Sequence, residues 1–243
     1  MSAVSEAVIL IAGQGSRLRG GDKNRLKPFV PLLGRPLLSY ILEAVSRAGV
    51  RTAHFVVGYE SERVIANAKQ LIPPDIKALF IVNREWEKQN GISLLAATGH
   101  VSAPFLLTMG DHVFEDAIVD CLVNKFEPGL LNIAIDRKID SIVDLDDAMK
   151  LQTCGNKVTS IGKNLQIYDA IDTGLFVCPL EIFAYLEQAK SRDGGGDCSL
   201  ANGVELMAID GKVRGIDIGS ARWHDVDTPQ VLEHAEHNPS WRV

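Results

Sequence analysis

A glycine-rich turn that carries two cationic side chains is the most chemically informative stretch of the sequence. An apolar run at residues 7–12 leads into the turn at residues 13–16, and Arg17 and Lys27 follow. Glycine lets the backbone turn sharply and bring its N–H groups close to an anion. Arginine and lysine supply the positive charge that a polyphosphate needs for close approach. The stretch therefore predicts a nucleoside triphosphate site, whereas the plainer alternative leaves both cations solvated at the surface.

Two better-known glycine loops do not fit this turn. The dinucleotide fingerprint G-x-G-x-x-G needs a third glycine where this chain has Leu18. The phosphate loop G-x-x-x-x-G-K-[ST] has no match anywhere in the sequence. A nicotinamide-dependent oxidoreductase is therefore disfavoured.

Acidic side chains follow two predicted strands that are far apart in the chain. Asp111 comes just after the apolar run at residues 105–109, and Asp225 and Asp227 follow a run that begins at Trp223. The carboxyl ends of strands form the edge at which open α/β sheets bind ligands. Carboxylates from two strands can meet on one Mg²⁺ ion, so Asp111 and Asp227 are the predicted ligands, with Asp225 in reserve. As an alternative, Asp227 could cap the helix that begins near Pro229.

Composition limits the class of protein. The chain has 243 residues, 46% of them hydrophobic, which suffices for one large core. A formal net charge of −6 argues against a general nucleic-acid binder. The sequence shows neither an apolar run of membrane-spanning length nor a signal peptide. Four widely spaced cysteines fit free thiols in a reducing cytoplasm better than a disulfide frame or a zinc site.

The elements that must position these residues alternate between strand and helix patterns. Apolar runs predict strands at residues 7–12, 54–57, 78–82, 105–109 and 131–135. Helical spacing predicts helices at residues 36–48, within 60–71, near residue 92 and at 117–126. Strands separated by helices imply parallel crossovers, so the sequence predicts an α/β protein with a doubly wound sheet.

The pattern changes after about residue 135. The acidic stretch at residues 140–147 predicts a solvated loop, and a hairpin turn separates strands at 149–153 and 157–161. Further on, the sequence predicts strands at residues 174–177, 213–218 and 223–226 and helices at 180–189, 199–207 and after Thr228. The prediction is a single domain over residues 1–243. About residues 7–135 form a nucleotide-binding half, and about residues 136–243 an acceptor-binding half.

The opening motif resembles a known signature. Residues 12–18, the Lys27-Pro28 pair and the turn at 34–37 are similar to the sugar-1-phosphate nucleotidyltransferase family, whose MobA-like single-domain members share A-G-x-G-x-R-L followed by K-P. Shorter strings further resemble the inositol-1-phosphate cytidylyltransferase branch; they lie at residues 89–94, 109–115, 161–165 and 168–174. The resemblance implies a Rossmann-like, GT-A-like fold with a mixed sheet and an acceptor-binding subregion.

The resemblance also implies roles for individual residues. Nucleotide binding falls to Ala12, Gly13, Gln14, Gly15, Ser16, Arg17, Lys27, Tyr59, Asn90 and Gly91. Arg17 and Lys27 would be catalytic, with Arg17 on the β- and γ-phosphates and Lys27 at the α-phosphate. Asp111 and Asp227 would hold Mg²⁺. Lys163 would bind the acceptor phosphate, and Asp172 would accept hydrogen bonds from acceptor hydroxyls.

The implied reaction joins CTP and inositol 1-phosphate to give CDP-inositol and pyrophosphate in the cytoplasm, as a step toward phospholipids. Members of this branch are often fused to a membrane-embedded CDP-alcohol phosphotransferase. This chain has no such module, so it is a stand-alone enzyme or an excised domain. Partners would be a nucleoside triphosphate and a phosphorylated polyol, with no nucleic acid and no membrane segment.

One stretch departs from the family pattern. Where the family commonly has P-L-T, this chain has Arg19-Gly-Gly-Asp22. The phosphate loop is therefore expected to be longer or looser, and residues 19–25, with two glycines and mixed charges, are expected to form a mobile lid.

Several residues keep a second interpretation. Tyr59 could stack on the base or pack at the end of a strand, and Lys163 could be an ordinary exposed lysine. His112 could touch a metal-bound water or serve only as a strand-end histidine. Asp172 enters an apolar strand, where a carboxylate needs a partner or a ligand.

Two other functions also remain open. The same reaction could use another acceptor, such as a sugar 1-phosphate or phosphocholine, or UTP or dTTP in place of CTP. A domain that senses nucleotides without catalysis is the alternative from a different class. The sequence argues against this last alternative, because a site without catalysis could lose its charged residues. This chain keeps all four: Arg17, Lys27, Asp111 and Asp227.

Overall fold

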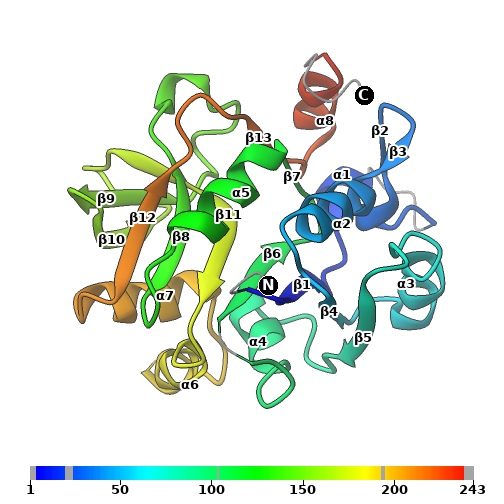
Figure 1. The fold of residues 1–243 in the computed structure, drawn as a ribbon, viewed down its shortest axis with the longest axis horizontal. Helices are drawn as coiled ribbons and strands as arrows, with labels where there is room; N and C mark the ends of the chain where they lie inside the picture. Colours follow the sequence, from blue (N-terminus) through cyan, green and yellow to red (C-terminus); the bar gives the residue numbers. More distant parts are fainter. Residues whose placement is uncertain (1–3, 20–23, 103, 193–194, 238–243) are drawn as a thin grey trace.

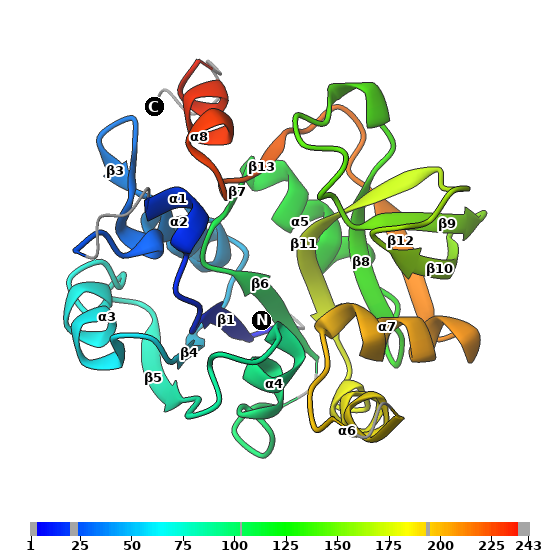
Figure 2. The ribbon, with the colours of Figure 1, turned by 180° about the vertical axis from the view of Figure 1, so that it is seen from behind.

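One mixed sheet organises the chain. The computed structural model describes residues 4–19, 24–102, 104–192 and 195–237. Within these residues, nine strands form the sheet, and helices lie on both of its faces (Figures 1 and 2). The strand order is β5 (Lys77–Val82), β4 (Thr52–Val57), β1 (Glu6–Ile11), β6 (Phe105–Met109), β11 (Ala170–Cys178), β8 (Leu131–Asp136), β12 (Val213–Asp217), β10 (Lys157–Gly162) and β9 (Lys150–Cys154).

The first four strands of this order are parallel, as predicted. β1 pairs in parallel with β4 on one side and with β6 on the other, and β4 pairs in parallel with β5. Their carboxyl ends therefore meet at one edge of the sheet, which is where the glycine turn and Asp111 follow β1 and β6.

The second half of the sheet is mixed. β11 lies between β6 and β8 and runs antiparallel to both, so β6 and β8 are not direct neighbours. β6 and β8 are therefore parallel to each other, as expected for the strands of the first half, and the antiparallel β11 between them makes the sheet mixed, as the resemblance implied. The chain reaches β11 through the β9–β10 hairpin and a turn, without a crossover helix. β9 also pairs back onto β11, which folds the hairpin toward the centre of the sheet.

Two hydrophobic cores fill the two faces of the sheet. Alternate residues of β1 serve them, because Val8 and Leu10 face one core while Ala7 and Ile9 face the other. The first core lies under α4 (Asn90–Leu95), α6 (Ile182–Arg192) and α7 (Leu200–Ile209). The second lies under α2 (Leu37–Arg47), α3 (Ser61–Ala68) and α5 (Asp116–Lys125).

A third, smaller core joins the beginning and the end of the chain. Leu18 on α1 (Ser16–Arg19) and Ala235 on α8 (Pro229–Glu236) belong to the same buried cluster as Val113 and Val226. The cluster also contains residues of the hairpin β2 (Pro31–Leu32) and β3 (Arg35–Pro36), which the sequence did not predict. β7 (His112–Phe114) pairs antiparallel with β13 (Trp223–Asp225) beside it (Figure 1).

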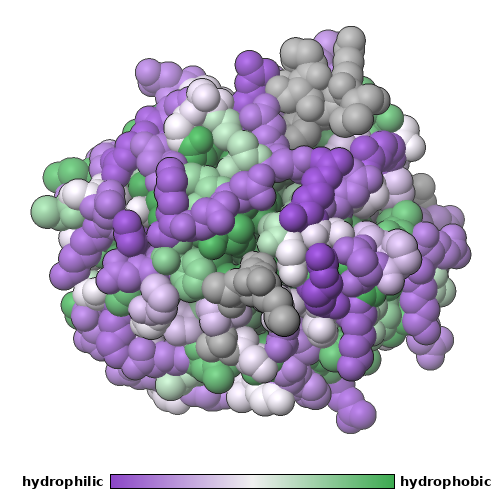
Figure 3. Space-filling view, in the orientation of Figure 1, coloured by the Kyte–Doolittle hydropathy of each residue, from purple (hydrophilic) through white to green (hydrophobic). Residues whose placement is uncertain are grey.

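Short elements and the surface complete the description. Two 3₁₀ helices, η1 (Lys27–Phe29) and η2 (Ile139–Ser141), lie in connecting segments. On the face of Figure 1, hydrophilic side chains cover much of the surface, and hydrophobic ones lie between them (Figure 3). Among the described residues, no helix is long and apolar enough to cross a membrane. The centre of the predicted lid, residues 20–23, lies outside the described residues.

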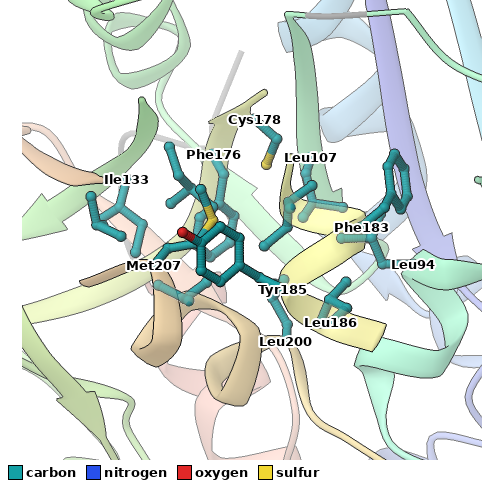
Figure 4. Close-up of a cluster of buried hydrophobic side chains, with 14 of the residues drawn as sticks. Leu94, Leu107, Ile133, Phe176, Cys178, Phe183, Tyr185, Leu186, Leu200 and Met207 are labelled. Carbon is teal, nitrogen blue, oxygen red and sulfur yellow. The ribbon is translucent and has the colours of Figure 1, made fainter. Parts of the chain in front are cut away.

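The first core supplies a test of the packing. Leu107 of β6 is fully buried in the cluster drawn in Figure 4, together with Phe176 and Phe183. We expect Leu107→Ala to lower the free energy of unfolding by about 2–5 kcal/mol, because the substitution leaves a cavity. Ile209→Ala removes an apolar side chain that is 66% exposed, and it should cost less than about 0.5 kcal/mol. Urea denaturation measures both, and equal midpoints for the two variants would contradict this packing.

Candidate functional site

The glycine turn between β1 and α1 is shaped around Lys27. Gly15 has a φ of +62°, and a Cβ there would lie 2.5 Å from Cβ of Lys27. Only glycine meets both conditions without strain. Around Gly13, by contrast, a Cβ would meet no atom within 4 Å, so this side of the turn is open. The turn thus lies along the lysine side chain, and a ligand can approach its open side.

The ammonium of Lys27 lies between two carboxylates. Its Nζ is 2.5 Å from Oδ2 of Asp111 and also contacts Oδ1 of Asp227. The side chain is only 12% exposed. A buried ammonium is stable when it is paired with carboxylates in this way. Removal of the ammonium would leave buried carboxylates without a partner, which is strongly unfavourable. Asp111 follows β6 and Asp227 follows β13. Lys27, in the N-terminal part of the chain, thus contacts one acid from the middle and one from the C-terminal part.

Two cavities share this group of charges. The smaller one has a volume of about 330 Å³ and is lined by Gly13, Gly15 and Ser16 of the turn and by Lys27. The larger one has a volume of about 960 Å³ and lies over β11, the N-terminal end of α7 and the segment around β13. Three residues line both cavities: Arg17, Asp111 and Asp227.

The predicted acceptor residues and two predicted nucleotide residues, Arg17 and Asn90, line the larger cavity. Lys163 and Asp172 are in its wall, and so is Asn90, whose Oδ1 accepts a hydrogen bond of 2.8 Å from the backbone N–H of Leu200. The Asn90 side chain therefore holds the start of α7, the helix whose Ala201 and Val204 form another part of the wall.

Four other predicted nucleotide residues lie outside the linings of these two cavities. The backbone oxygen of Ala12 accepts a 2.9 Å hydrogen bond from Tyr59, and the Tyr59 ring packs edge-on against Trp86 with 5.3 Å between centroids. A Cβ on Gly91 would lie 2.6 Å from the backbone oxygen of Cys198, so close packing accounts for this glycine. Gln14 is exposed. Contacts of these four residues with a nucleotide stay predictions.

A histidine joins two of the acids. Nδ1 of His112 is 2.6 Å from Oδ1 of Asp111 and 3.8 Å from Oδ1 of Asp225. The ring stacks on Trp223, whose indole N–H donates a 3.0 Å hydrogen bond to Oδ2 of Asp136. His112 is therefore more than a strand-end residue, because it is held between acids and an aromatic ring.

The charges around His112 shift its titration and that of its neighbours. Burial alone lowers the pKa of His112, but the negative charges of Asp225 and Asp111 outweigh it and raise the pKa to about 9. Burial favours the neutral form of Asp111, yet the charges of Lys27 and His112 hold its pKa far below the usual range. Burial, together with the nearby charge of Asp111, raises the pKa of Asp225.

This cluster has the donor set for a divalent cation. Asp111, His112 and Asp225 each offer a ligand atom, and the three atoms lie within 4.8 Å of one another. Among the described residues, Oδ1 of Asp225 is a buried oxygen without a hydrogen-bond partner. Carboxylate oxygens suit a hard cation such as Mg²⁺, so the residues fit a metal ion. The geometry thus favours Asp225, the reserve candidate, as the partner of Asp111.

The alternative interpretation of Asp227 as a helix cap is wrong. The N-cap of α8 is Thr228, whose hydroxyl accepts a hydrogen bond from the backbone N–H of Val231. The Asp227 carboxylate instead contacts Lys27 and Arg17. A role of Asp227 as a metal ligand stays a prediction, and its observed partners are the two cations.

The acidic loop is not merely solvated. Oδ2 of Asp147 is 2.7 Å from Nη1 of Arg17, and its Oδ1 contacts Nζ of Lys163. The sequence prediction of a solvated loop is therefore wrong for Asp147. Nothing in the local sequence distinguished this aspartate from Asp140, Asp144 or Asp146, because its partners are 130 and 16 residues away.

Asp172 lies at an irregularity of β11. The register of β11 against β8 shifts between Asp172 and Phe176, and Gly174 between them has a φ of +74°. Oδ1 of Asp172 accepts a 2.7 Å hydrogen bond from the backbone N–H of Gly174. Burial raises the pKa of Asp172 to about 6, although that hydrogen bond and the charge of His112 act in the opposite direction. A bulge of this kind turns a side chain out of the strand pattern, here toward the cavity.

The fold and the site together define a class of protein. A mixed α/β sheet with a glycine turn, two cations beside it and acids at the carboxyl ends of its strands is typical of a nucleotide-binding enzyme. Residues 7–140 match the model of the MobA-like NTP transferase domain. The chain belongs to the MobA-like NTP transferase family, and it is a nucleotidyltransferase.

Proteins of similar sequence support the assignment to this family. The chain is 36% identical over 230 residues to the bifunctional IPC transferase and DIPP synthase of Thermococcus kodakarensis, with 94% of this chain and 49% of that protein covered. It is 30% identical over 229 residues to the bifunctional protein GlmU of Methanocaldococcus jannaschii, with 94% and 53% covered. The chain thus spans about half the length of these relatives.

A solved structure has the same fold. The inositol-1-phosphate CTP transferase from T. maritima superposes with a TM-score of 0.78 at 23% sequence identity, with 97% of this chain and 98% of that one covered. The prediction of a GT-A-like, Rossmann-like fold with a mixed sheet is confirmed.

The raised pKa of Asp172 gives a test by pH. In the unfolded chain its pKa is about 3.9, so the folded state holds this proton more tightly. The cost of ionising Asp172 is therefore absent below about pH 4, grows up to about pH 6, and is complete above that. We expect Asp172→Asn to be more stable than the wild type by about 3 kcal/mol at pH 7.5, with no difference at pH 3.5. Urea denaturation at both pH values measures this, and a difference that does not change with pH would contradict it.

Proposed function

We propose that the protein joins CTP and inositol 1-phosphate to give CDP-inositol and pyrophosphate. The observation that carries the proposal is the position of Lys27, whose ammonium is held by two aspartates where the two cavities meet. Such a cation can neutralise two phosphates at once. The names of the T. kodakarensis and T. maritima proteins support the choice of inositol 1-phosphate and CTP.

We assign one substrate to each cavity. The smaller cavity, with the glycine turn and Lys27, suits the triphosphate, and the larger one, with Lys163 and Asp172, suits the phosphorylated polyol. Residues 7–135 would then form the nucleotide-binding half of one domain over residues 1–243, and residues 136–243 the acceptor-binding half. Arg17 lines both cavities and so can reach phosphates of both substrates.

The chemistry requires positioning and charge neutralisation more than a base. A phosphate monoester has a second pKa of about 6, so its oxygen is already mostly ionised at neutral pH. That oxygen attacks the α-phosphorus in line, a new P–O bond forms, and the bond to the departing pyrophosphate breaks. Two unit charges 4 Å apart repel by about 4 kcal/mol at an effective dielectric constant of 20. Lys27 and Arg17 reduce this repulsion from fixed positions.

Enzymes of this type generally use a divalent metal, and we propose Mg²⁺ here. Asp111 and Asp225 would hold the ion, and Asp227 is close enough to Asp111 to contact the same lysine. When bound, the ion would neutralise negative charge on the phosphates. The protein side chains would still have to orient both substrates.

A second candidate keeps the reaction and changes the substrates. The M. jannaschii relative has a different name, so another sugar 1-phosphate, phosphocholine, or UTP or dTTP remains an alternative. A domain that only senses nucleotides is not favoured, because the family is enzymatic and the group of cations and acids is intact. The T. kodakarensis protein is named for a second activity, DIPP synthase, and a functional link of this chain to a membrane CDP-alcohol phosphotransferase stays a proposal. The free cysteines support a cytoplasmic location.

A substrate screen tests the proposal. Pyrophosphate release would be measured with CTP, UTP, dTTP and ATP, each against inositol 1-phosphate, glucose 1-phosphate and phosphocholine, with Mg²⁺ and with EDTA. We expect CTP with inositol 1-phosphate to react fastest, and EDTA to stop the reaction. Faster release with another pair would replace the proposed substrates, and no release with any pair would refute the enzymatic proposal.

Lys27 tests the mechanism. We expect Lys27→Met to lower kcat/KM by about 10²–10³-fold, as the loss of a fixed charge-stabilising donor does in other enzymes. Lys212→Met is the matched control, because Lys212 pairs with Glu181 away from both cavities, and it should keep wild-type activity. Circular dichroism would check that both variants fold. Near-normal turnover of Lys27→Met would exclude Lys27 from the reaction.

A further inference from the structure

Asp147 holds two cations that come from distant segments of the chain and line the larger cavity. Its Oδ2 contacts Arg17, which comes from α1, and its Oδ1 contacts Lys163, which follows β10. All three residues line the cavity. Both carboxylate oxygens are thus used, each on a different cation, as two oxygens of a bound phosphate would be.

The two cations belong to different parts of the site. Arg17 also contacts Asp227, so it keeps an acidic partner if Asp147 moves away. The side chain of Lys163 is 47% exposed, and within the described residues it forms an ion pair with Asp147. Hydrogen bonds from Lys163 and Arg17 outweigh burial and lower the pKa of Asp147, so its carboxylate is ionised at neutral pH.

We propose that Asp147 determines which charge class of acceptor the larger cavity accepts. Its carboxylate holds the place of the acceptor phosphate between Arg17 and Lys163, and an acceptor must displace it to bind there. This inference rests on the proposed function for the identity of the acceptor. It adds that Asp147 is the residue that disfavours monoanionic and uncharged molecules at this place.

The discrimination follows from the charges. A phosphate monoester carries about two negative charges at pH 8 and presents three oxygens, so it gains more from the two cations than the single carboxylate loses. A phosphodiester carries one charge and gains no such advantage, and a free polyol carries none. The Asp147 carboxylate therefore disfavours the binding of monoanionic and uncharged molecules that share the shape of the acceptor.

An acceptor can displace the Asp147 carboxylate at a small cost in free energy, because the ion pairs of Asp147 are partly exposed. The side chains of Arg17 and Asp147 are 53% and 36% exposed. Exposed ion pairs contribute up to about 1 kcal/mol, which corresponds to a factor of about five in affinity. A competing carboxylate of this strength would weaken acceptor binding without preventing it.

The test is a titration of the full chain at pH 8 with methyl phosphate, a dianion, and with dimethyl phosphate, a monoanion. Asp147→Asn keeps the shape of the side chain and removes its charge, and Asp147→Ser is a second variant should the first unfold. Asp146→Asn is the matched control, because it removes an exposed charge from the same loop. Lys163→Gln, alone and combined with Asp147→Asn, reports whether the probe binds at this pair of cations.

We expect Asp147→Asn to bind methyl phosphate about five-fold more tightly than the wild type does. The preference for methyl phosphate over dimethyl phosphate should be smaller in this variant. Asp146→Asn should change neither, and Lys163→Gln should remove the gain. Unchanged or weaker binding by Asp147→Asn, an equal gain in Asp146→Asn, or a gain that survives Lys163→Gln would each overturn the proposal. The titration needs neither CTP nor turnover, so its result is separate from that of the substrate screen.

Discussion

Alternation of charge is the constraint on which the site depends. Cations and carboxylates follow one another across both cavities, each touching the next, in the order Lys163, Asp147, Arg17, Asp227, Lys27, Asp111 and His112. Lys27, Asp111 and His112 are largely buried, and a buried charge without a partner is costly, so these members fix one another's positions. Under the proposed function, substrates with several negative charges would exchange places with some of these acids. Substrate binding and charge neutralisation would then be one process.

The local part of this arrangement could be predicted from the sequence. The glycine turn, Arg17 and Lys27 lie within one short stretch, and Asp111 directly follows an apolar strand. Periodic apolar residues also identified the strands of the first half, because buried parallel strands and amphipathic helices have distinct spacing. The structure and the comparisons confirm the predicted α/β class, the family and the mixed sheet. The roles of individual site residues stay predictions.

What escaped prediction depends on contacts between distant segments. Asp147 looks like any other acid of its loop until Arg17, 130 residues earlier, is placed beside it. The choice between Asp225 and Asp227 beside Asp111 depends on how β13 pairs with β7, and a single sequence does not give that register. The antiparallel insertion of β11 likewise follows from the path of the chain through the β9–β10 hairpin. Local spacing carries no information on any of these.

The third core has a consequence for biosynthesis. Leu18 and Ala235 pack in one cluster, and Asp227 reaches back to Lys27 near the start of the chain. During translation the early segments emerge first, and domains tend to fold in that order. The glycine turn is therefore synthesised long before Asp227, and Lys27 lacks one of its two carboxylates until the segment with Asp227 has been made. Premature encounters of the nascent chain with nucleotides would meet an incomplete pocket.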